Sequence, residues 1–197
     1  MIRPGARTGD HVRSRIIAKA DELFRAQGYA KTTIAAIAQA LDVSPAYIYK
    51  FFESKNAVVE AAVERDIEQI RADVLAAAGG RDRAIARIEN VVLAVLHSHR
   101  QRFENAAFIH ELILLANEQK WACIRRWKSE LREIFAALIE AGTRAGDFRV
   151  DDPLAAADFV MDSVMVFLHP LLLTERSPEE SVRRARAHVR WIERALR

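Results

Sequence analysis

The sequence predicts an all-α protein, and three observations lead to this class. Only seven glycines and five prolines occur among 197 residues, so little material is available for the tight turns that sheets need. Ala, Leu, Ile, Glu and Arg, which favour helices, dominate the composition. Apolar residues recur at helical spacing in about nine segments. With 51% apolar and 29% charged residues, we expect a folded chain. It has a small N-terminal part, residues 1–55, called the head below, and a larger remainder, residues 56–197, called the body.

The first segment of the chain predicts a basic arm followed by a helix. Residues 1–10 carry arginine and glycine without an apolar repeat, so we expect a flexible arm. Residues 11–27 place apolar side chains on one helical face, including Ile16, Ala20 and Phe24. Gly28 follows directly and is expected to end this helix in a left-handed conformation.

The next two segments predict a pair of short helices joined by a tight turn. Thr32 or Thr33 can cap a helix that ends near Leu41. After a turn that contains an apolar valine, Ser44 is a candidate N-cap, and residues 45–52 form a helix that begins with a proline. Two short helices joined in this way are typical of a helix-turn-helix.

The body is predicted to be helical throughout. Ser54 can cap a long helix that reaches about residue 78 and connects the head to the body. Two glycines follow, and the remaining helices are predicted near residues 82–99, 102–117, 120–142, 153–173 and 178–196.

Charge is divided unevenly along the chain. Residues 1–55 hold nine Lys/Arg and five Asp/Glu, a net charge of +4, whereas residues 56–197 hold 21 and 22, a net charge of −1. A basic head on a neutral body is typical of nucleic-acid-binding proteins, although solvated surface charge alone produces excesses of this size. The single cysteine, Cys123, cannot form an internal disulfide, which fits a cytoplasmic location. The most apolar stretch, residues 159–173, is too short and too polar to span a membrane.

The third helix and the start of the fourth carry the candidate chemistry. Tyr47 and Tyr49 can donate to phosphate oxygens, and Lys50 can reach a phosphate or a base edge. Both tyrosines could equally be packing or surface aromatics. Lys55 stands in the first turn of a helix, where a cation opposes the macrodipole unless an anion is bound there. A solvated lysine is the alternative and costs only about a few tenths of a kcal/mol.

Residues 28–55 closely resemble the DNA-binding signature of the tetracycline-repressor-like (TetR) family. The shared pieces are the glycine-aromatic pair after the first helix, the threonine that opens the second, Ile37-Ala38, Val43-Ser44, Ile48-Tyr49-x-x-Phe52 and Ser54-Lys55. The resemblance implies that phosphates are met by Thr33, Tyr49 and Lys55, and that bases lie near Ser44, Pro45, Ala46, Tyr47 and Lys50. Two residues depart from the pattern. Asp42 stands where the family has glycine, and Tyr47 where it often has threonine; aspartate tolerates the left-handed turn.

The resemblance also implies that the body encloses a small-molecule effector and pairs with a second copy. Candidate effector residues combine aromatic walls with two polar anchors, although each could be ordinary core: Phe103, Phe108, His110, Glu111, Trp121, Trp127 and Phe135. Candidate homodimer residues form apolar stripes on the last two long helices: Phe159, Val160, Val164, Phe167, Leu168, Leu171, Val189 and Ile192. The arginine-rich face of the last helix is interpreted as solvated.

The sequence therefore predicts a DNA-binding domain over residues 11–55 and a ligand-binding and dimerisation domain over residues 56–197. The expected function is a repressor that a small-molecule effector releases from its DNA operator. An activator, a ligand-independent regulator and, more remotely, a helical protein-interaction module remain as alternatives. An enzyme is not expected, because His110-Glu111 has Leu114 where a zinc protease needs its second histidine. No cofactor or metal is expected.

Overall fold

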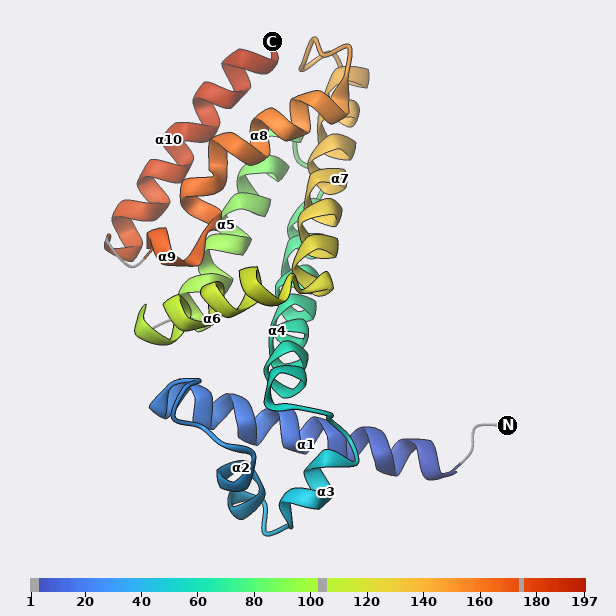
Figure 1. Cartoon of the computed structure of the whole chain (residues 1–197). Coiled ribbons are helices and arrows are strands. Elements are labelled where there is room, and N and C mark those ends of the chain that lie inside the picture. Colours follow the sequence, from blue (N-terminus) through green and yellow to red (C-terminus); the bar gives the residue numbers. More distant parts are fainter. Residues whose placement is uncertain (1–3, 103–105, 174–175) are drawn as a thin grey trace. The chain divides into compact units, whose positions relative to one another are not determined.

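The computed structural model describes residues 4–102, 106–173 and 176–197, and all regular structure within these ranges is helical. The prediction of an all-α fold with about nine helices is confirmed. The described residues form nine helices and one further helical turn of four residues, α9 (Figure 1). In chain order these are α1 (Pro4–Gln27), α2 (Ile34–Ala40), α3 (Pro45–Tyr49), α4 (Lys55–Ala78), α5 (Ala84–Arg102), α6 (Ala106–Gln119), α7 (Ala122–Arg144), α8 (Pro153–Leu168), α9 (Pro170–Leu173) and α10 (Pro178–Leu196).

The helices form two compact units. The first unit contains the chain up to Asp66 together with residues 107–123, and the second contains residues 67–106 and 124–197. The chain therefore passes between the units within α4 and at both borders of the segment 107–123. The functional division expected at residue 56 stays a prediction, because a boundary of compactness and a boundary of function need not coincide.

The first helix begins earlier than the sequence predicts. α1 starts at Pro4, so residues 4–10 are helical and the arm expected over residues 1–10 is wrong for this part. Proline suits the first turn of a helix, and each glycine inside it costs only about 1 kcal/mol. The end of α1 agrees with the prediction, because Gly28 has a φ of +87° and its N–H donates to the carbonyl of Phe24 at 2.9 Å.

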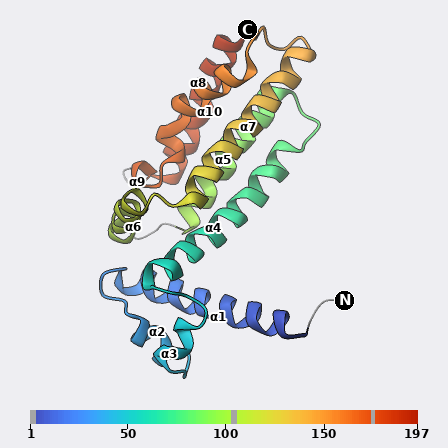
Figure 2. The same cartoon turned by 45° about the vertical axis from the view of Figure 1, so that its right-hand side comes forward.

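The second unit has an apolar core made by α5, α7, α8 and α10, together with the end of α4 (Figure 2). α5, α8 and α10 pack against one another, and α7 contributes Phe135, which is fully buried. Near the end of α7, Gly142 lies directly under the ring of Phe148; a Cβ on this glycine would stand 2.3 Å from a ring carbon. Phe148 thus closes one end of the core because residue 142 has no side chain.

The helix predicted over residues 153–173 is wrong in its length, because it is two elements. α8 ends at Leu168, and His169 has an extended backbone with φ −84° and ψ 118° before Pro170 begins α9. The proline ring disfavours helical geometry at the residue before it, which explains the break.

Candidate nucleic-acid interface

The helix-turn-helix is assembled from α2 and α3 through their caps. Thr33 is the N-cap of α2, and its hydroxyl accepts from the N–H of Ala36 at 3.1 Å. Ser44 is the N-cap of α3, and its hydroxyl accepts from the N–H of Tyr47 at 3.2 Å. Both predicted caps are confirmed, and each satisfies a backbone donor that the helix itself leaves unpaired.

The turn between these helices depends on Asp42. Its φ of +56° is left-handed, as the sequence analysis expected for this departure from glycine. The following N–H, of Val43, returns to the carbonyl of Ala38 at 3.0 Å. This bond holds the two helices in contact and directs α3 out of the turn.

α3 presents a polar surface over one apolar anchor. Ile48 is fully buried, whereas Tyr49 is 54% exposed. Tyr47 is half-buried, and its ring centroid lies 5.3 Å from that of Phe51. The Lys50 ammonium lies 5.8 Å from the centre of the Tyr47 ring. Tyr47 therefore has packing partners and is also partly exposed. The regular helix ends at Tyr49, three residues earlier than the predicted end at Phe52.

Six of the eight predicted DNA-contacting residues have exposed side chains: Thr33, Ser44, Pro45, Ala46, Tyr49 and Lys50. Tyr47 and Lys55 are half-buried. These positions therefore give α3 and the start of α2 a surface of hydroxyls, one ammonium group and small side chains that can approach a groove closely.

Lys55 has a role that the sequence analysis did not foresee. Ser54 caps α4 as predicted, accepting from the N–H of Ala57 at 3.1 Å, but the Lys55 ammonium turns back into the head. It donates to the carbonyls of Tyr29 and Thr32, each at 3.0 Å, and lies 3.9 Å from the centre of the Tyr29 ring. Burial lowers the pKa of Lys55, and the carboxylate of Glu111 opposes this effect. The ammonium therefore has partners within the chain, and its contact with a phosphate stays a prediction.

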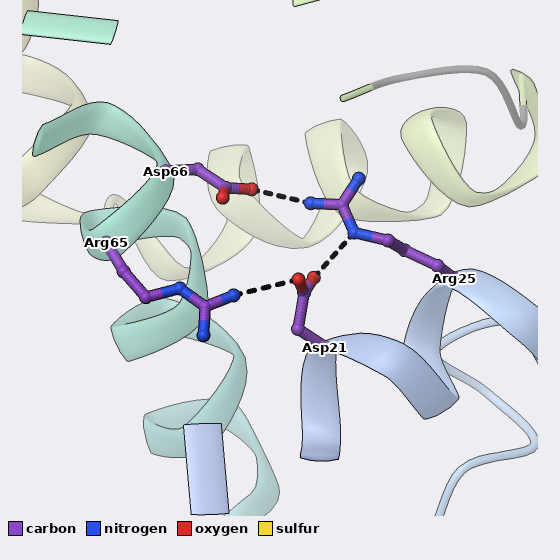
Figure 3. A network of polar contacts seen from close by, with 4 residues as sticks. All are labelled: Asp21, Arg25, Arg65 and Asp66. Atoms are coloured by element: carbon purple, nitrogen blue, oxygen red, sulfur yellow. Dashed lines mark hydrogen bonds and ion pairs between the residues drawn. The ribbon is translucent and has the colours of Figure 1, made fainter. Parts of the chain in front are cut away.

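Four charged residues join α1 to the middle of α4 (Figure 3). Asp21 accepts from Arg25 at 2.9 Å and from Arg65 at 2.8 Å, and Arg25 also reaches Asp66 at 2.7 Å. The two aspartates are only 16% and 12% exposed, so solvent screens these pairs less than it screens pairs on an open surface. The alternating charges hold α1 against α4.

Arg13 is a basic residue of this unit that the sequence analysis missed. Arg13 is an exposed residue, and its guanidinium carbon lies 4.3 Å from the centre of the ring of Phe52, just after α3. This cation–π contact joins residues 39 positions apart, so helical spacing carries no signal for it.

The described candidate effector residues are divided between the two units. Trp127 and Phe135 lie in the core of the second unit, whereas Trp121 and Glu111 belong to the first. Glu111 is bound to the head, where its carboxylate accepts from the N–H of Tyr29 at 2.8 Å. Phe103 and the side chains of Phe108 and His110 lie outside the described residues. An open groove of about 540 Å³ lies along α10 and is lined by other residues: Pro178, Glu179, Val182, Arg183, Arg186 and Arg190.

The predicted dimer residues occupy both buried and exposed positions of the single chain, and the interface stays a prediction. Six of them are buried within the single chain: Val160, Val164, Phe167, Leu168, Val189 and Ile192. Helical spacing shows that residues share a face, but it does not show whether that face meets the chain's own core or a partner. Phe159, by contrast, is 47% exposed, and the side chain of Leu171 lies outside the described residues.

The part of the chain that the structure describes holds no cluster of three or more His, Cys, Asp or Glu side chains arranged to bind a metal ion. None of its helices combines the length and the apolar character that crossing a membrane requires.

A short helix pair with capped termini, a left-handed turn and an exposed polar second helix defines the class of helix-turn-helix DNA-binding proteins. Comparison with known proteins agrees. Residues 16–62 match the family model of bacterial regulatory proteins of the tetR family, and residues 84–189 match that of the tetracyclin repressor-like C-terminal domain. The chain belongs to the tetR family of bacterial transcriptional regulators.

Individual relatives extend over most of the chain. The HTH-type transcriptional repressor KstR2 of Rhodococcus jostii (strain RHA1) is 25% identical over 159 residues, which cover 78% of this chain and 76% of that protein. A tetR-family regulatory protein from Rhodococcus RHA1 is 28% identical, with a TM-score of 0.64 and coverage of 93% and 96%. A TetR/AcrR-family regulator from Thermobifida fusca is 23% identical and shares the fold, with a TM-score of 0.72 and coverage of 95% and 99%.

Proposed function

We propose that this regulator is a homodimeric repressor that binds operator DNA through α2 and α3 and is released by a small-molecule effector. The observation that carries the proposal is the surface of α3, which exposes Tyr49 and Lys50 above the buried anchor Ile48. In a helix-turn-helix dimer, two such surfaces stand about one DNA turn apart, ~34–36 Å, and read two half-sites. A ligand that favours a different spacing weakens DNA binding.

The DNA contacts fall into two groups. We assign Thr33 and Tyr49 to phosphates, and the residues at the start of α3, together with Lys50, to the neighbourhood of the bases. Lys55 is left out of the contact surface because its ammonium is bound to two carbonyls of the head.

DNA selection from a random duplex library, followed by fluorescence anisotropy, tests the proposal. We expect the full chain to enrich one palindromic sequence and to bind it with an affinity that falls steeply with salt. Lys50→Ala should weaken binding by about 1–3 kcal/mol and relax the sequence preference, since this residue is assigned to the bases. Failure to enrich any sequence, or binding that salt does not affect, would refute DNA recognition. A reporter placed behind the enriched sequence distinguishes repression from activation.

The homodimer is proposed on exposed apolar side chains of α8 and α10. Phe159 on α8 and Trp191 on α10 are 47% and 65% exposed, and the two helices pack against each other. Aromatic side chains left in solvent on adjacent helices favour an interface between copies. Trp191→Glu should therefore shift the chain to monomers in analytical ultracentrifugation, whereas Leu75→Glu, which places the same charge at an exposed leucine of α4, should not. A dimer that survives Trp191→Glu would contradict this interface.

For the effector, we propose a site in the second unit beside Trp127 and Phe135. Both side chains are aromatic, as the walls of small-molecule pockets commonly are. Screening for compounds that displace the enriched operator, followed by tryptophan fluorescence of a Trp127→Phe variant, tests this location. A compound that releases the DNA but quenches the variant as strongly as the wild type would place the site elsewhere.

A further inference from the structure

The carboxylate of Glu111 occupies an unexpected place, the loop that leads into the helix-turn-helix. This loop runs from Gly28 to Thr32, between the end of α1 and the cap of α2. Glu111 accepts from the N–H of Tyr29 at 2.8 Å and lies 3.4 Å from the N–H of Ala30. Its oxygen would stand 3.3 Å from a Cβ at residue 28, so the glycine allows this close approach.

Lys55 holds the same loop from its carbonyl side. Its ammonium donates to the carbonyls of Tyr29 and Thr32, while the Tyr29 hydroxyl donates to the side-chain oxygen of Asn56. Thr32 completes the arrangement, because its hydroxyl donates to the carbonyl of Gly28 at 2.8 Å. The backbone on both sides of Tyr29 is therefore held by charged side chains, an anion at the N–H and a cation at the carbonyl.

Glu111 differs from the other residues of this arrangement in where it comes from. The others belong to the segment up to Asp66, whereas Glu111 is on α6, in a stretch of the first unit that is covalently joined at both borders to the second unit. The carboxylate therefore joins α6 directly to the backbone of Tyr29. From Tyr29 the chain continues to Thr33, the cap of α2, and α3 packs on α2.

We propose that Glu111 is a positioning residue for DNA recognition, through which α6 sets the conformation of the loop before α2 and hence the orientation of α3. The proposal rests on the function proposed above. It assigns no DNA contact to Glu111; the carboxylate acts through the backbone of Tyr29.

The test compares two DNA affinities of the full chain, one for the operator enriched by the wild type and one for a duplex of unrelated sequence. Glu118→Ala is the matched control, because it removes the same charge from an exposed position of the same helix. Removal of an acidic charge by itself tightens or leaves unchanged the binding to both duplexes. Loss of positioning instead weakens only the specific complex. We expect Glu111→Ala to lower the ratio of specific to non-specific affinity about tenfold or more, and Glu118→Ala to leave it unchanged.

A second measurement follows the loop itself. In the wild type, the amide proton of Tyr29 should exchange slowly with solvent, and Glu111→Ala should accelerate this exchange at least tenfold while the amides of the second-unit core keep their protection. If Glu111→Ala does not fold, Glu111→Gln replaces it, with a loss of about threefold expected because the neutral amide is a weaker acceptor.

An unchanged affinity ratio in the folded variant, or equal changes for both duplexes, would overturn the proposal. These results differ from a failure of the proposed function, in which the wild type itself enriches no operator.

Discussion

Replacement of Lys55 separates two roles that the same residue could have, a phosphate contact and a support of the head. In the structure, its ammonium makes hydrogen bonds of 3.0 Å to the carbonyls of Tyr29 and Thr32 and contacts the Tyr29 ring. Hydrogen bonds from charged groups contribute about 1.5–3 kcal/mol each, and a partly exposed cation–π contact adds about 0.5–1 kcal/mol. Lys55 is half-buried, so water replaces part of this stabilisation after its removal.

We therefore expect Lys55→Met to lower the free energy of unfolding by about 2–3 kcal/mol. For a chain of this length, about 2–4 °C of melting temperature corresponds to each kcal/mol, so the midpoint should fall by roughly 4–12 °C. Thermal unfolding followed by far-ultraviolet circular dichroism measures this change. Lys31→Met is the matched control, since Lys31 is exposed in the same loop and its loss changes the net charge equally.

The same two variants test the phosphate contact. A lysine that neutralises one phosphate lowers the slope of log affinity against log salt by about one when it is removed. We expect no such change for Lys55→Met at temperatures where it is folded. A variant as stable as the wild type but with a reduced salt slope would refute the reasoning and restore Lys55 to the DNA surface.

Three further predictions concern the packing and charges of the two units. Gly142→Ala should destabilise the second unit by about 1–3 kcal/mol in urea unfolding, because the new methyl group overlaps the ring of Phe148; a stable variant would contradict this packing. A double-mutant cycle on Asp21 and Arg65 should give a coupling of about 1 kcal/mol, and a coupling near zero would show that the ion pair contributes nothing. Burial, assisted by a nearby lysine, lowers the pKa of His169, so the unfolded chain binds the extra proton first and stability should fall as the pH drops from about 7 to 5. His169→Gln should flatten this dependence in melting curves, and an equally steep curve would argue against it.

The local features of the fold were predictable from the sequence because they depend on neighbours in the chain. The caps Thr33, Ser44 and Ser54 each bond a backbone N–H within the first turn that follows them. The left-handed turn at Asp42 depends on the conformational preference of one residue. Helical periodicity predicted most of the elements. It failed at the start of α1, where glycines are tolerated in a helix, and before Pro170, where the proline ends the helix.

The sequence did not show in the same way which surface each apolar face packs against. Helical spacing correctly grouped Val160 and Val164 on one face, but the three-dimensional packing directs that face into the chain's own core. Exposed residues such as Phe159 and Trp191, which packing leaves in solvent, are therefore better candidates for the dimer interface than the buried members of the apolar stripes.

The sequence by itself determined that this chain is an all-α regulator with a helix-turn-helix, because helix periods, caps and turns are written in short segments. Only the tertiary structure decided which groups Lys55 and Glu111 contact. Glu111 lies 82 positions from the N–H it accepts, and Lys55 lies 26 positions from one of its carbonyls. A charged side chain is satisfied by whichever group the folded chain brings to it, and in this structure Lys55 and Glu111 both contact the backbone of the loop before α2.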